Sequence, residues 1–166
     1  MKTSTDRMIA MKDGPIGWMQ FNNPARHNAV SLDMWQAVPE ILAEFERDDA
    51  IRVVVLRGAG ERAFVSGADI SEFAEKRSSQ DTVAHYNKIS QRANVAIIDC
   101  SKPTIAMIQG YCIGGGLAVA LGCDIRLAAA NSRFAVPAAK LGLGYAFDGI
   151  KRLIDVVGPA YAKEIF

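Results

Sequence analysis

Residues 103–128 read PTIAMIQGYCIGGGLAVALGCDIRLA, and this stretch decides the fold class. The apolar, partly β-branched run 104–108 predicts a buried strand. Three consecutive glycines at 114–116 lead into an Ala/Leu-rich segment, 117–122, which predicts a helix that ends near its last glycine. Residues 124–128 predict a further strand. A strand, a glycine turn, a helix and a strand in this order are typical of an α/β fold.

The N-terminal part of the chain shows the same alternation. Strands are predicted at 8–11 and 16–21, joined by a turn that contains glycine and proline. A helix is predicted over 31–48, with Ser31 as its N-cap. Because Pro39 lies inside this span and lacks a backbone donor, we expect a kink or two short helices there.

The rest of the chain alternates in a similar way. The sequence predicts a buried strand at 51–56, a loop that includes 64–69, a helix over 80–100, a short strand at 133–135, and a helix over 149–166 with a break at Gly158-Pro159. The chain stops inside this last apparent helix without a C-cap. We therefore expect the natural protein to continue beyond it.

Composition and charge limit the function. A length of 166 residues, with 50% hydrophobic and 22% charged residues, predicts one globular domain. The net charge of +1 argues against wholesale attraction to nucleic acid or to anionic membranes. The longest apolar stretches are too short to span a bilayer, and the N-terminus lacks the apolar core of a signal peptide. Three cysteines without a CxxC pair are typical of small buried residues in a reducing compartment, so we expect a cytoplasmic protein.

Several catalytic and cofactor motifs are absent or incomplete in the sequence. Residues 58–63 (GAGERA) match a GxGxxA dinucleotide-binding pattern after a strand, but that motif needs a helix to begin within it. Residues 64–67 (FVSG) follow instead, which favours a plain loop. No P-loop, HExxH or GxSxG pattern occurs, and His27 and His85 stand far apart, so no metal site is expected.

Two glycine-bearing turns are each predicted to open a helix, and this pairing is the strongest chemical signal. Residues 66–70 (SGADI) lead into 71–76, and the glycines 114–116 lead into 117–121. A helix N-terminus carries unsatisfied N–H donors, and glycine lets a ligand approach the backbone. Two such termini aimed at one carbonyl oxygen would form an oxyanion hole, worth about 3–4 kcal/mol per donor. Close helix–strand packing is the alternative explanation for either turn alone.

Four motifs in order along the chain resemble the crotonase (enoyl-CoA hydratase/isomerase) family. They are residues 23–30 (NPARHNAV), 63–70 (AFVSGADI), 103–116 (PTIAMIQGYCIGGG) and 122–128 (GCDIRLA). The resemblance implies an α/β, crotonase-like spiral of ββα units over residues 1–166, without the family's C-terminal helices. It also implies trimers or dimers of trimers, and an acyl-CoA thioester as substrate, with no separate cofactor because coenzyme A is part of that substrate.

The resemblance also assigns roles to individual residues. The backbone N–H groups of Ala68 and Gly115 would be the oxyanion donors. The implied substrate-binding positions are Arg26, Ala29, Gly67, Ala68, Asp69, Ile70, Ser71, Gly114 and Gly115. Arg26 would meet a phosphate of coenzyme A, although a solvated surface charge is an equal alternative. For Asp69 we favour a helix-capping role over a catalytic one.

The sequence departs from the family at the two catalytic glutamates of hydratases. Ala118 and Ala138 stand at these positions, and alanine cannot transfer a proton. Tyr145 resembles a tyrosine that borders the leaving carboxylate in methylmalonyl-CoA decarboxylase, but it could also simply line the acyl pocket. Asp148 is the only carboxylate in that loop, where capping or solvation is favoured over proton transfer. The resulting hypotheses are an acyl-CoA lyase or isomerase that stabilises an enolate, a decarboxylase-like lyase, and a non-catalytic acyl-CoA-binding relative. A dinucleotide-binding oxidoreductase is the weakest.

Overall fold

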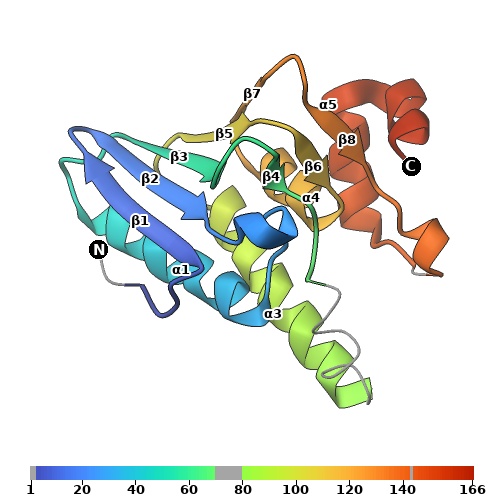
Figure 1. The fold of residues 1–166 in the computed structure, drawn as a ribbon, viewed down its shortest axis with the longest axis horizontal. Helices are drawn as coiled ribbons and strands as arrows, with labels where there is room; N and C mark the ends of the chain where they lie inside the picture. Colours follow the sequence, from blue (N-terminus) through green and yellow to red (C-terminus); the bar gives the residue numbers. More distant parts are fainter. Residues whose placement is uncertain (1–2, 70–79, 143) are drawn as a thin grey trace.

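The computed structural model describes residues 3–69, 80–142 and 144–166 of the chain. Strands and helices alternate along it (Figure 1). The elements are β1 (Met8–Asp13), β2 (Ile16–Phe21), η1 (Pro24–Arg26), α1 (Leu32–Arg47), β3 (Val53–Gly58), β4 (Ala63–Val65), α3 (Gln80–Ile98), β5 (Thr104–Ile108), β6 (Tyr111–Ile113), α4 (Gly115–Gly122), β7 (Ile125–Ala128), β8 (Arg133–Ala135), η2 (Ala139–Leu141) and α5 (Phe147–Ile165).

The strands form two sheets that the chain visits in turn. The larger sheet has the order β1-β2-β3-β5-β7, with an antiparallel β1–β2 pair and parallel pairs elsewhere. The smaller sheet, β4-β6-β8, is entirely parallel. Each of the pairs β3–β4, β5–β6 and β7–β8 places one strand in each sheet and precedes α3, α4 and α5 respectively. This repeated ββα unit is the predicted spiral.

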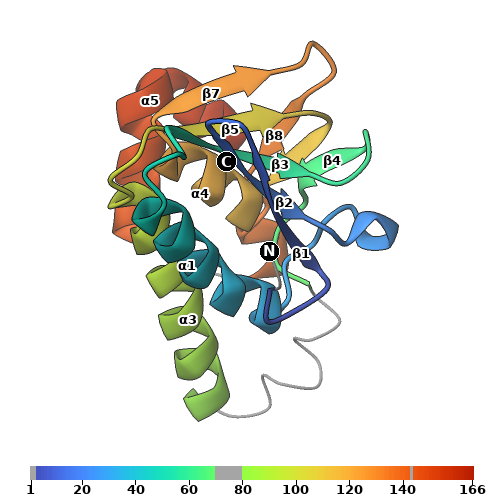
Figure 2. The same ribbon diagram turned by 90° about the vertical axis from the view of Figure 1, so that its left-hand side faces the viewer.

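The hydrophobic core lies between the larger sheet and the helices. Helices α1, α3 and α4 lie on one side of this sheet (Figure 2). The apolar face of α1 is buried there through Met34, Trp35, Val38, Ile41, Leu42 and Phe45. Burial of such side chains stabilises the fold by about 1.5–3 kcal/mol each. Neighbouring sheet residues Met19, Phe21 and Leu56 complete this contact.

The structure differs from the prediction for the first helix in two details. Helix α1 is one continuous helix past Pro39 and not two short ones, because its buried residues on both sides of the proline pack into one core. Ser31 does stand at the N-cap position, but its hydroxyl donates to the side chain of Asp33 and makes no capping bond to the helix backbone.

Other differences concern short strands and element bounds. Residues 63–65 form β4 where a loop was expected, and Tyr111–Ile113 form β6, which hydrophobic patterning did not reveal. Both strands have three residues, too few for a periodic signal. The strand expected at 51–56 lies at Val53–Gly58. The last helix begins at Phe147 and bends at Gly158, where φ is 77°, as the Gly-Pro pair predicts.

Two of the three cysteines are buried, as the sequence predicts. Cys112 and Cys123 are buried, and burial raises the pKa of each thiol to about 12. Cys100 is half-buried, and none of the three forms a disulfide. Over the part of the chain that the structure describes, no helix combines the length and apolar character needed to cross a membrane.

Candidate active site

The glycine turn after β6 presents free backbone donors. Gly114 occupies a conformation with φ 53° and ψ −113°, and its N–H donates to the carbonyl of Ala135. Helix α4 begins at Gly115, so the first N–H groups of this helix lack intrahelical acceptors. Within the described residues, the Gly115 N–H has no acceptor at all. The turn therefore presents a donor at the positive end of the α4 dipole.

Gly116 serves packing rather than ligand approach. A Cβ on Gly116 would lie 2.1 Å from the carbonyl oxygen of Val65, so α4 and β4 touch at this position. A Cβ on Gly115 would instead meet nothing closer than 3.4 Å. The two neighbouring glycines thus differ: backbone contact requires glycine at 116, whereas position 115 has room for a methyl group in ordinary contact with Trp35.

The second predicted donor lies beside the first. Ala68 forms a parallel bridge with Val30, in which the Val30 N–H donates to Gly67 and the Asp69 N–H donates to Val30. These bonds leave the Ala68 N–H without an acceptor among the described residues. The Ala68 nitrogen lies 3.8 Å from the position of a Cβ on Gly115. Two segments separated by 47 positions in the sequence thus bring two unpaired N–H groups together.

A buried aromatic residue that the sequence reasoning missed lies behind this pair of donors. Trp35 is 2% exposed, and its Cζ2 atom would be 3.4 Å from a Cβ on Gly115. Its indole N–H donates to the Tyr86 hydroxyl of α3 at 2.9 Å. The indole therefore fixes Gly115 from one side and links α1 to α3. In the sequence, Trp35 stands beside Met34 on the predicted helix, but only the packing of α1 places its ring against Gly115.

Arg26 and Asp69 form an ion pair next to the Ala68 turn. Arg26 Nη1 lies 2.9 Å from Asp69 Oδ1, and the carboxylate side chain is 5% exposed whereas the arginine side chain is 53% exposed. The structure thus places both predicted binding residues together, and it gives Asp69 an ion-pairing role. The helix that Asp69 was expected to cap, and the predicted binding residues Ile70 and Ser71, lie outside the described residues.

The loop that carries Arg26 and Ala29 is held by a buried amide. Asn28 is fully buried with φ 56°. Its Nδ2 donates to the carbonyls of Ala59 and Ala63, and its Oδ1 accepts from the Asn23 N–H. Ala29 follows, itself buried, and leads directly into the Val30 bridge. Asn28 therefore anchors the first loop to the start of β4.

Asn28→Asp is expected to destabilise the protein by roughly 3 kcal/mol or more, because it replaces two donors with a buried carboxylate that faces two carbonyl oxygens. Asn87→Asp, on the exposed surface of α3, is the matched control and should change stability by less than about 0.5 kcal/mol. Urea unfolding of both variants measures the difference. Equal midpoints would contradict the anchoring role.

Comparison with known proteins identifies the family. The family model described as enoyl-CoA hydratase/isomerase matches residues 12–166. The chain belongs to this family. It is 35% identical over 162 residues to the short-chain-enoyl-CoA hydratase of Clostridium acetobutylicum, a match that covers 96% of this chain and 60% of the relative. It is 31% identical to the peroxisomal Delta(3,5)-Delta(2,4)-dienoyl-CoA isomerase of Arabidopsis thaliana, over 92% of this chain and 58% of the relative.

A solved structure agrees with this assignment. The enoyl-CoA hydratase/carnithine racemase of Magnetospirillum magneticum superposes with a TM-score of 0.92 at 38% identity, covering 99% of this chain and 61% of that one. The two sheets and the ββα units described above are therefore those of the enoyl-CoA hydratase/isomerase family. The chain spans about 60% of the length of the curated relatives it matches.

The two alanines at the family's expected glutamate positions lie in ordered backbone. Ala118 is half-buried in α4, and its N–H donates to the carbonyl of Gly114. Ala138 is buried immediately before η2 and belongs to the hydrophobic core. Neither side chain can accept or donate a proton.

Tyr145 lies against the last helix of this family member. Its ring meets Phe166 edge-on, with the centroids 5.1 Å apart, and a Cβ on Gly149 would lie 2.6 Å from Tyr145 Cε1. Burial raises the pKa of the phenol above its usual value of 10. The raised pKa favours the protonated phenol, whose hydroxyl can donate a hydrogen bond. Asp148 lies exposed in the first turn of α5, where its negative charge interacts favourably with the helix dipole. The N-terminus of α5 has no side-chain capping hydrogen bond.

Proposed function

We propose that this chain binds an acyl-CoA thioester and stabilises its enolate through the backbone N–H groups of Ala68 and Gly115. The observation that carries the proposal is that the Ala68 nitrogen lies 3.8 Å from the position of a Cβ on Gly115, so the two donors belong to adjacent backbone segments. One relative is named an enoyl-CoA hydratase and another a dienoyl-CoA isomerase, and both names support a CoA thioester as the substrate class. No separate cofactor is needed, because the thioester itself supplies the carbonyl.

The two donors suit a developing negative charge. When a carbanion forms next to a thioester, its electron pair delocalises onto the carbonyl oxygen. Two N–H groups already fixed by the Val30 bridge and the α4 N-terminus need no reorganisation to bind that oxygen. Such donors contribute about 3–4 kcal/mol each to the transition state. The α4 dipole adds to the same effect.

Decarboxylation is a second candidate, favoured by the alanines at 118 and 138. In this reaction the bond between the α-carbon and the carboxylate breaks, carbon dioxide leaves, and the electron pair forms the enolate. This first step needs an oxyanion hole but no base. The enolate then takes a proton from solvent water at its α-carbon, which gives the saturated thioester. The protonated Tyr145 hydroxyl could donate a hydrogen bond to the substrate carboxylate. Alternatively, Tyr145 forms part of the wall of the acyl pocket.

The test is to incubate the protein with crotonyl-CoA and with methylmalonyl-CoA and to identify each product by mass. Loss of carbon dioxide from methylmalonyl-CoA, with crotonyl-CoA unchanged, would favour the decarboxylase. Addition of water to crotonyl-CoA would mean that a base other than residues 118 and 138 serves hydration. Binding without turnover would favour a non-catalytic relative. Failure to bind any acyl-CoA would contradict the proposal.

Tyr145→Phe is expected to leave acyl-CoA affinity unchanged and to slow turnover about tenfold or more if the hydroxyl contacts the reacting group. The ring stays in place against Phe166 and Gly149, so stability should change little. Steady-state kinetics, with the thermal midpoint as the folding control, measures both. An unchanged rate would assign Tyr145 to the pocket wall.

A further inference from the structure

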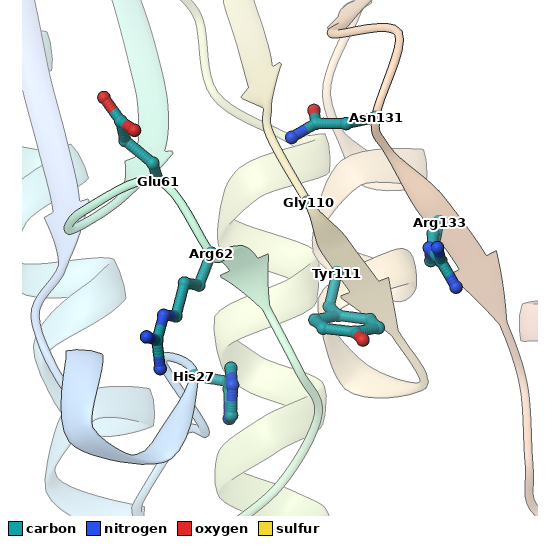
Figure 3. A pocket seen from close by; sticks show the side chains of 7 residues that line it. All are labelled: His27, Glu61, Arg62, Gly110, Tyr111, Asn131 and Arg133. Atoms are coloured by element: carbon teal, nitrogen blue, oxygen red, sulfur yellow. The ribbon is translucent and has the colours of Figure 1, made fainter.

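A hollow lies at the end of the smaller sheet opposite to the oxyanion donors. Its volume is about 460 Å³, and its wall includes His27, Arg62, Tyr111, Asn131 and Arg133 (Figure 3). Arg62 immediately precedes β4 and Tyr111 begins β6, whereas Ala68 and Gly115 follow the far ends of these strands. The hollow and the candidate active site are therefore at opposite ends of the same two strands.

The backbone that carries the hollow is tightly connected. The Tyr111 N–H donates to the Arg62 carbonyl, and the Arg133 N–H donates to the carbonyl of Gly110. A Cβ on Gly110 would lie 2.0 Å from the Arg62 carbonyl oxygen, so the segments touch directly. The His27 ring meets the Tyr111 ring edge-on at 5.8 Å. Residues from four separate parts of the chain are thus fixed around one space.

The charges around this space are unbalanced. Neither the Arg62 nor the Arg133 guanidinium has an ion-pair or hydrogen-bond partner within the described residues. Glu61 is the acidic residue of the wall, and its carboxylate points away from Arg62 and Tyr111 in Figure 3. The Tyr111 hydroxyl, the His27 ring and the Asn131 amide add further groups that can donate hydrogen bonds. This set presents two free cations and several hydrogen-bond donors to whatever fills the hollow.

We propose that this hollow binds the phosphate group of a small molecule, with Arg62 and Arg133 as its principal ligands. A guanidinium offers donors in a planar fork that matches phosphate oxygens, and a phosphomonoester near pH 7 carries close to two negative charges. Arg62 and Arg133 line the hollow on either side of Tyr111 (Figure 3), and each supplies one positive charge to a bound anion. A volume of about 460 Å³ falls within the range of small-molecule sites and leaves room for an organic group beside the phosphate. The site goes beyond the proposed oxyanion chemistry and does not depend on it.

The chain offers a local probe for the test, because it contains only two histidines, His27 in the hollow and exposed His85 on α3. Inorganic phosphate is titrated at constant ionic strength while the imidazole C–H signals are followed by proton NMR. We expect a saturable shift of the His27 signal and none of His85, with His27→Gln assigning the peaks. Parallel or unsaturable shifts of both signals would overturn the proposal.

Arginine variants give the second arm. The double variant Arg62→Gln/Arg133→Gln should weaken phosphate binding by about tenfold for each arginine removed. Arg92→Gln, an exposed arginine on α3, is the matched control and should bind phosphate normally. Equal affinities in these two proteins would contradict the assignment.

A third arm distinguishes the sources of the phosphate. Adenosine 3′,5′-bisphosphate and glucose 6-phosphate are titrated in the same way. A His27 shift with the bisphosphate alone would identify the nucleotide end of coenzyme A as the ligand. A shift with both would identify a general phosphomonoester site. In either case the double arginine variant should lose the response, and this result stands even if the acyl-CoA turnover assays fail.

Discussion

Gly115→Pro is expected to lower turnover of the acyl-CoA substrate about 10²–10³-fold, because proline removes one of the two N–H donors to the thioester oxygen. Proline is well tolerated at the first position of a helix, and residue 115 is the first position of α4. The variant should therefore fold, with a thermal midpoint near that of the wild type. Single-turnover kinetics with saturating substrate measures the loss at the chemical step.

Gly115→Ala is the matched control for this result. The added methyl group would meet Trp35 Cζ2 at 3.4 Å, an ordinary contact, and the backbone N–H remains. We expect turnover within about tenfold of the wild type, a cost below about 1.4 kcal/mol. If proline and alanine at this position gave the same rate in folded protein, the N–H of residue 115 would have no part in catalysis.

Gly116→Ala, one residue further on, is expected to destabilise the protein by roughly 3 kcal/mol or more. A methyl group here would lie 2.1 Å from the Val65 carbonyl oxygen and 2.7 Å from Val65 Cβ, so α4 would have to move away from β4. Overpacking in a core usually costs about 1–3 kcal/mol, and here the obstacle is backbone, which cannot rotate aside. Alanine otherwise favours a helix by about 1 kcal/mol over glycine, which offsets only part of this cost.

Chemical unfolding of Gly115→Ala and Gly116→Ala side by side tests this difference. The first variant should unfold near the wild-type midpoint and the second at a much lower denaturant concentration. Similar midpoints for the two would mean that α4 does not contact β4 as closely as the structure has it.

The sequence predicts most of the fold because long elements have strong periodic signals. The helix over 80–100, the strand 104–108 and the glycine turn into α4 were recovered nearly residue for residue, since apolar spacing and glycine position decide them. The three-residue strands β4 and β6 were not, because so few residues give no periodicity. The alternative of two short helices at Pro39 is wrong, because tertiary packing of α1 outweighs a local propensity.

The candidate site was only partly accessible from the sequence. Motifs indicated Ala68 and Gly115 as donors, and the structure brings them together. The Arg26–Asp69 pair and the packing of Trp35 against Gly115 depend on contacts between segments far apart in the chain, for which no local pattern exists. The unpaired arginines at 62 and 133 likewise line one hollow only when β4, β6 and β8 align.

The central claim is that Ala68 and Gly115 hydrogen-bond a thioester carbonyl, and isotope-edited infrared spectroscopy observes that bond directly. A ¹³C label at the thioester carbonyl of a saturated acyl-CoA isolates its stretching band, which does not require turnover. Two N–H donors polarise the carbonyl, so the bound band should lie at lower frequency than in water and should return toward the free value in Gly115→Pro. A bound thioester whose carbonyl band remains at its free frequency in the wild-type protein would contradict the oxyanion hole.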